Sequence, residues 1–191
     1  MSGILILLAI ALAVVGIIIG IHNGIIEKYN RVKQAWSDVV VQERQKVNIL
    51  PKIEALLNEH KVFETELQSN ITKMRTSLIE LSSTTEFDTD KLKELEEATK
   101  AMKGGLKATF EAYPDLKSHN LYGSVMNEIA EQEENVGAAI RIYNSNVATF
   151  NTSIQTFPNS VINRNFTNKS EVEHFENETI ESSLQFKPSF K

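Results

Sequence analysis

The residues of this 191-residue chain whose types and spacing could do chemistry are a few acidic residues and histidines. Glu171 and His174 have the Glu-x-x-His spacing with which one helix supplies ligands to a di-iron centre. Such a centre needs this motif from two helices and a lone glutamate from each of two others. The motif occurs once, close to the C-terminus, so solvated charge is the better interpretation. We expect no metal site.

The other candidates for chemistry are dispersed along the chain. The remaining histidines are far apart and lack ligand partners at suitable spacing: His22, His60 and His119. The acidic run at residues 131–134 fits a solvated helix face, because no neighbouring feature marks a pocket. Nucleophile-elbow, phosphate-loop and glycine-fingerprint motifs are absent, and the chain has no cysteine. We therefore expect no catalytic residue, no cofactor and no enzymatic activity.

The N-terminal stretch predicts a membrane anchor over residues 1–26. Residues 4–21 carry no charge, and the run through Ile26 is long enough for a helix to cross about 30 Å of hydrocarbon. The lipid bilayer is thus the first expected partner. A cleavable signal peptide is the alternative, since small residues alternate over 9–13. That pattern lies inside the apolar run, however, and residues 1–3 contain no Lys or Arg.

Charge and glycine spacing add two expectations about the anchor. Basic residues follow it, beginning with Lys28 and Arg31, so the positive-inside rule places the N-terminus outside and the body in the cytoplasm. Gly16, Gly20 and Gly24 recur every four residues and line one side of the helix. Small residues at this spacing let membrane helices approach closely, although membrane helices are rich in glycine in any case. The spacing predicts a homo-oligomer whose anchors pack through this face.

The body, residues 27–158, reads as a long antiparallel, coiled-coil-like bundle of three to four helices. Apolar residues recur at steps of three and four, with a restart expected near Pro51 and a cap at Asp88 or Thr89. The longest run predicts a helix over residues 118–157. The fold class is therefore all-α, with a transmembrane helix that continues into the bundle. Large aromatic residues of the predicted bundle core are Trp36, Tyr143, Phe150 and Phe157.

The C-terminal segment, residues 159–191, is rich in Asn, Ser, Thr and Glu. We interpret it as a mostly irregular polar tail whose isolated aromatic residues contact the bundle. The formal net charge of −5 gives no electrostatic reason to expect nucleic acid as a partner.

Two blocks of the chain resemble the LemA family of bacterial single-pass membrane proteins. The blocks are Asn30-Arg31-Val32-Lys33-Gln34-Ala35-Trp36-Ser37 with Ile49-Leu50-Pro51 after it, and Ala112-Tyr113-Pro114-Asp115-Leu116-Lys117 with Tyr143-Asn144, Asn151-Thr152 and Phe157-Pro158 after it. The tail adds Phe175-Glu176 and Leu184-Gln185-Phe186. The chain departs from the family where His22, Val40, Asn48 and Lys52 replace the usual Tyr, Asp, Asp and Asn. The resemblance implies a membrane-anchored helical body in a bacterial plasma membrane, and it implies no particular chemistry.

Two functions are compatible with these features. The first is a non-enzymatic membrane scaffold or assembly protein that presents a long helical surface to partners or to copies of itself. The alternative is a regulatory or adaptor subunit of a membrane enzyme, such as a peptidase, with the bundle as its docking arm. The two differ in their expected partner, which is a second copy in one case and another membrane protein in the other.

Overall fold

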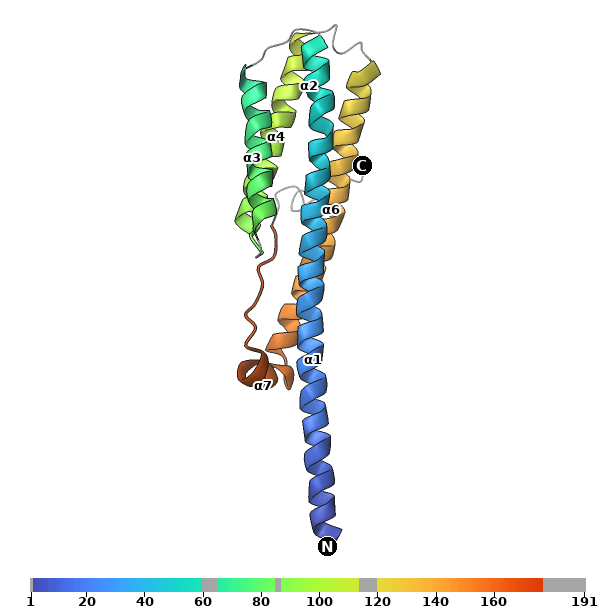
Figure 1. The fold of residues 1–191 in the computed structure, drawn as a ribbon, viewed down its shortest axis with the longest axis vertical. Helices are drawn as coiled ribbons and strands as arrows, with labels where there is room; N and C mark the ends of the chain where they lie inside the picture. Colours follow the sequence, from blue (N-terminus) through green and yellow to red (C-terminus); the bar gives the residue numbers. More distant parts are fainter. Residues whose placement is uncertain (1, 60–64, 85–86, 114–119, 177–191) are drawn as a thin grey trace, which may run out of the picture.

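The computed structural model describes residues 2–59, 65–84, 87–113 and 120–176. Within these ranges the chain is helical or irregular and forms no strand, which confirms the all-α prediction. Its elements run antiparallel to one another, and the lower part of the first helix projects beyond the rest (Figure 1). In order they are α1 (Ser2–Gln45), η1 (Lys46–Ile49), α2 (Leu50–Glu59), α3 (Thr65–Ser83), α4 (Thr89–Ala112), α6 (Asn120–Gln155), α7 (Asn159–Ile162) and η2 (Asn163–Thr167).

The helix α1 has two halves that differ in what surrounds them. It contains 44 residues and is therefore about 66 Å long. Residues 2–17 are exposed, whereas from Ile25 onward one face of the helix is buried in the bundle. Pro51 lies at the start of α2, which follows the 3-10 turn η1. The predicted restart near Pro51 is thus confirmed, and proline is tolerated there because the first N–H groups of a helix have no intrahelical partner.

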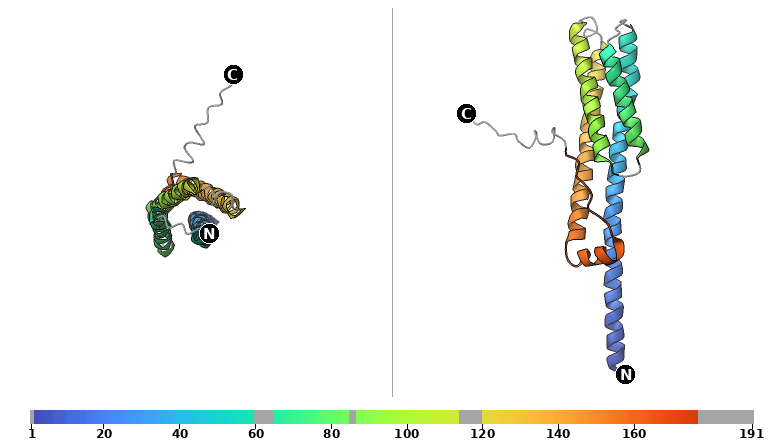
Figure 2. Two further views of the ribbon diagram at one scale, coloured as in Figure 1. Left: turned by 90° about the horizontal axis from the view of Figure 1, so that it is seen from above. Right: turned by 90° about the vertical axis from the view of Figure 1, so that its left-hand side faces the viewer.

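Helices α1 and α6 pack antiparallel along most of their shared length. The ring centroids of Trp36 and Tyr143 are 5.2 Å apart, and those of Tyr29 and Phe150 are 5.4 Å apart. Both helices therefore advance by seven residues, about two turns, between the two contacts. Seen from above, α3, α4 and α6 form an arc around α1 (Figure 2).

The α3–α4 hairpin completes the upper bundle. Asp88 caps α4 as predicted, because its carboxylate accepts a hydrogen bond from the Lys91 N–H at 3.0 Å. Glycine lowers helix propensity, but α4 runs through both Gly104 and Gly105. A Cβ at Gly105 would lie 3.4 Å from the Asn70 amide nitrogen and 3.5 Å from a Leu67 methyl group. The missing side chain therefore permits the close approach of α4 to α3.

The structure places three of the four predicted core aromatics inside. Tyr143 and Phe150 are fully buried and Trp36 is 6% exposed, but Phe157 is 85% exposed, so its assignment to the core is wrong. The physical reason is that α6 ends at Gln155. The helical spacing that links Phe150 with Ile154 no longer applies two residues beyond that end.

The tail is more tightly packed than its composition predicts. Its first part forms α7 and the π-helical turn η2, and residues 168–176 are irregular, in agreement with the expected mostly irregular tail. Ile162, Val172 and Phe175 are buried against the bundle. Leu184 and Phe186 lie outside the described residues. The domain boundaries at residues 26 and 158 remain predictions, and α1 runs without interruption through the first of them.

A charged pair lies inside the bundle. Glu43 is fully buried and Lys46 is 6% exposed, and the lysine Nζ lies 2.9 Å and 3.1 Å from the two carboxylate oxygens of Glu43. Burial raises the pKa of Glu43 above its ordinary value, and the positive charge of Lys46 opposes that rise. Because the folded state binds this proton more tightly than the unfolded state, the contribution of Glu43 to stability is greatest at low pH. It falls as the pH rises through the folded pKa.

We predict that Glu43→Gln removes this pH-dependent part of the stability. The free energy of bundle unfolding, measured by urea denaturation of the full chain in detergent between pH 4.5 and 8, should increase in the variant relative to the parent as the pH rises. Lys46→Met should instead destabilise the bundle by about 3–5 kcal/mol at neutral pH, because it leaves the buried carboxylate unpaired. A difference between Glu43→Gln and the parent that is the same at every pH would contradict the raised pKa.

Candidate interaction surfaces

The anchor presents an open glycine face. A Cβ built at Gly16 or Gly20 would meet no atom of the described chain within 4 Å, and one at Gly24 would reach only the Lys28 Nζ at 4.0 Å. In the single chain this face is therefore available to another helix. Whether the glycines pack against a second anchor, as their spacing predicts, stays a prediction.

An aromatic cluster joins α1, α6 and Phe87, which lies two residues before the start of α4. Phe87 lies 6.2 Å from Trp36 and 6.3 Å from Tyr143 between ring centroids, and it also contacts Tyr29 at 5.9 Å. The Tyr143 hydroxyl donates a hydrogen bond to the carbonyl oxygen of Glu173 at 3.0 Å, and burial raises the pKa of Tyr143 above its ordinary value. The cluster thereby connects the bundle core to the C-terminal segment.

Three asparagine side chains hold the C-terminal segment. We call residues 168–176 the strap and Asn144, Asn151 and Asn163 the amide ladder. Asn144 accepts from the Phe175 N–H and donates to the Phe175 carbonyl, both at 2.8 Å. Asn151 pairs in the same way with Val172, at 3.0 and 2.8 Å, and Asn163 pairs with Lys169, at 3.0 and 2.9 Å.

The geometry of the ladder follows from helix and chain dimensions. Asn144 and Asn151 are seven residues apart on α6, so they are separated by about 10.5 Å along its axis. Val172 and Phe175 are three residues apart, and an extended chain covers about 10 Å in that distance. The two spacings match, so both backbone groups of every third strap residue are satisfied by one side-chain amide.

Further contacts fix the strap at each end. The Lys169 Nζ lies 4.2 Å from the centre of the Tyr29 ring, a cation–π distance. Gln155 donates to the Glu171 carboxylate at 2.8 Å, and Thr89 lies 3.4 Å from the Glu173 carboxylate. The Glu-x-x-His residues singled out in the sequence therefore lie on the strap.

Among the residues that the structure describes, the candidate metal ligands do not form a metal site. Within the described ranges no group of three Asp, Glu, His or Cys side chains is placed to hold a metal ion. Glu133 forms an ion pair with Lys103 at 2.6 Å, while Glu131 and Glu134 are exposed. His60 and His119 lie outside the described residues.

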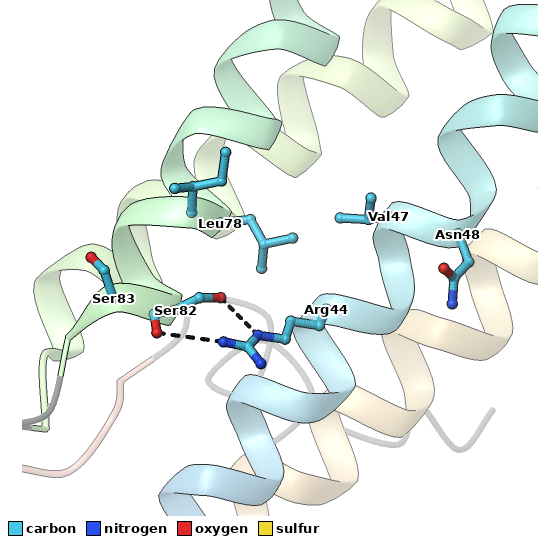
Figure 3. A pocket seen from close by; sticks show the side chains of 7 residues that line it. Arg44, Val47, Asn48, Leu78, Ser82 and Ser83 are labelled. Carbon is cyan, nitrogen blue, oxygen red and sulfur yellow. Dashed lines mark hydrogen bonds between the residues drawn. The ribbon is translucent and has the colours of Figure 1, made fainter.

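A groove between α1–η1 and α3 was not predicted from the sequence. It encloses about 480 Å³ and is lined by Arg44, Val47, Asn48, Leu78, Ile79, Ser82 and Ser83. Arg44 crosses one end of it, and its guanidinium donates to the hydroxyl and the carbonyl oxygen of Ser82 at 3.0 and 3.4 Å (Figure 3). Ile79 is 68% exposed on the α3 side. The groove lies between two helices that are distant in sequence, and no spacing within either helix signals it.

Comparison with known proteins gives a family and one curated relative. A sequence model described as the LemA family matches residues 35–188. The protein named LemA of Metamycoplasma hominis is 34% identical over 141 residues, which cover 73% of this chain and 62% of that protein. The matched region thus spans less than two thirds of the relative.

We predict that the amide ladder contributes measurably to stability. Asn151→Ala leaves the N–H and C=O of Val172 without their partner in a partly buried position, which should cost about 1–3 kcal/mol of unfolding free energy. Limited proteolysis should also cut the strap faster than in the parent. Asn146→Ala is the matched control, because the Asn146 amide donates only to Ile142 of its own helix and its loss should cost about 0.5 kcal/mol or less. Equal effects of the two substitutions would argue against the ladder.

Proposed function

This chain belongs to the LemA family, and from that premise we propose that it is a membrane-anchored, non-enzymatic scaffold. Its bundle presents a long helical surface to copies of itself or to partner proteins. The observation that carries the proposal is the continuity of α1, whose exposed apolar first half and buried second half form one helix. A bundle attached in this way keeps a fixed direction relative to its anchor.

The continuity of α1 also favours an uncleaved anchor over a signal sequence. Among the described residues this is the one helix long and apolar enough to cross a membrane, and none of its most apolar window is buried. The small-x-small pattern at residues 9–13 lies within that helix, about two turns from its start. Cleavage there would leave an exposed apolar remnant on a body already in water, which is unfavourable.

The proposed location is a bacterial plasma membrane, crossed once, with the body in the cytoplasm. The basic residues that follow the anchor support this orientation, since Lys28, Arg31 and Lys33 lie within the first two turns of helix after it.

A regulatory or adaptor role is the second candidate function, and the α1–α3 groove favours it. The groove lies in the upper bundle and has the apolar side chain of Ile79 at its edge. A partner membrane enzyme, such as a peptidase, could dock there without contacting the anchor. Stoichiometric co-purification of one membrane enzyme from cross-linked native membranes supports this role, whereas self-assembly of the purified chain supports the scaffold.

We predict that the chain forms homo-oligomers through the glycine face. Replacing Gly16 and Gly20 with Ile should reduce the amount of cross-linked oligomer in membranes, because the added side chains keep two helix backbones apart. The control replaces Leu8 and Leu12 with Ile, which changes exposed anchor residues without adding volume. If both double variants assemble like the parent, the glycines do not form the contact.

We predict the orientation from the charge distribution. The chain has no cysteine, so single cysteines can be placed without a background. In intact cells a membrane-impermeant thiol reagent should label Ser2→Cys and should label Lys73→Cys, on the exposed side of α3, only after the membrane is opened. The reverse pattern would place the body outside.

A further inference from the structure

Exposed apolar side chains gather at one end of the bundle. Outside the projecting part of α1, the described chain has seven large hydrophobic residues that are strongly exposed, and three of them lie within ten residues of one another. These are Phe157, Val161 and Phe166, with exposed fractions of 85%, 50% and 57%. We call residues 157–167 the basal segment. Contiguous exposed apolar surface rimmed by polar residues is typical of sites that contact a membrane or another protein.

The basal segment lies where α1 leaves the bundle. Both α7 and η2 contact α1, and the first α1 residues with partial burial are Ile18 and Ile21. The α1–α6 contacts pair residue 36 with 143 and residue 29 with 150. Helix α6 ends at Gln155, five residues beyond Phe150, so its end lies level with residue 24 of α1, and the basal segment follows directly. In two views the basal segment is the lowest part of the bundle, and α1 continues alone beyond it (Figures 1 and 2).

The length of the projecting helix matches one bilayer. From Ser2 to His22 an α-helix rises by about 30 Å, at 1.5 Å per residue. The hydrocarbon core of a bilayer is about 30 Å thick. If this stretch of α1 crosses the membrane, the boundary between hydrocarbon and headgroups falls beside the basal segment, whose elements α7 and η2 contact α1.

The chemistry of the basal segment suits that boundary. Its apolar side chains alternate with Asn and Thr, and it carries the exposed cation Arg164. Aromatic and aliphatic groups next to cationic and amide groups are the combination found where a protein lies in the headgroup layer. Ile162, within the segment, is buried in the bundle core, so the segment itself is held against the bundle.

We propose that the basal segment inserts Phe157, Val161 and Phe166 into the interfacial layer of the same bilayer that the anchor crosses. The bundle then has two attachments to the membrane, the anchor and the basal segment. Together they restrict the tilt of the bundle, which a single helix would leave free. This inference rests on the proposed membrane anchor.

Spin labels on single cysteines test the proposal in the full chain. The chain is reconstituted in liposomes of phosphatidylcholine with a minority of phosphatidylglycerol, and labels replace Phe157, Phe166, Leu12 or Ile79 one at a time. Oxygen, which concentrates in lipid, and a water-soluble nickel chelate compete as relaxation agents. The oxygen-to-nickel accessibility ratio at 157 and 166 should be several-fold higher than at Ile79, an exposed apolar position on α3.

The labels separate the failure of this proposal from that of the anchor. A lipid-like ratio at Leu12 with a water-like ratio at 157 and 166 keeps the anchor and overturns the basal contact. A water-like ratio at Leu12 overturns the anchor itself. Low accessibility to both agents at 157 and 166 means that a second protein copy covers the segment, which also overturns the lipid contact.

A second set of variants tests the aromatic side chains directly. With the label at Val161, replacing Phe157 and Phe166 with Ser should shift the label towards water, as a several-fold fall in the accessibility ratio. Replacing Val41 and Ile142 with Ser removes two exposed apolar side chains elsewhere, outside the groove, and should leave the ratio unchanged. An unchanged ratio in the phenylalanine variant would overturn the proposal.

Discussion

The structure depends on one helix that meets two different surroundings. The first part of α1 is apolar and exposed on every side, while the second part buries a single face against α6. No turn separates the two parts. The rotation of the anchor about its helix axis therefore fixes which face of α1 points into the bundle. The position of α6, and of the α3–α4 hairpin beyond it, follows from that face.

The lower half of the α1–α6 pair is not covered by helices α3 and α4, and the C-terminal part of the chain packs there instead. Helices α3 and α4, of 19 and 24 residues, are shorter than α6, with 36. Tyr29 packs on Phe150 at the lower end of the hairpin, where Phe87 and Lys169 of the strap also contact it, and α7 packs against both long helices. The cover is an irregular chain, so its backbone groups need partners that a helix would provide internally, and the amide ladder supplies them.

The features that could be predicted from the sequence are the buried faces of the helices, from the periodicity of apolar residues, and one helix cap. The spacing of Trp36, Tyr143 and Phe150 places them on buried stripes, and the local chemistry of Asp88 predicts a cap. Phe157 continues the same stripe in sequence but follows the end of the helix, so periodicity misassigns it. The amide ladder was missed because each bond joins residues between 6 and 31 positions apart, and asparagine in a polar region looks like solvated surface. The groove beside Arg44 depends on how α1 and α3 are placed relative to each other, which neither helix encodes alone.

The amide ladder has a consequence for how the C-terminal part of the chain can change in evolution. The asparagines bind the N–H and C=O groups of the strap, which every residue except proline possesses. The exposed side chains of Glu171, Glu173 and His174 can therefore be replaced without altering what the ladder recognises. Descendants of a common ancestor could keep this backbone path while their strap sequences drift apart. Homology in this region would then be visible in the three asparagines and in the spacing between them, rather than in the amino-acid sequence of the strap.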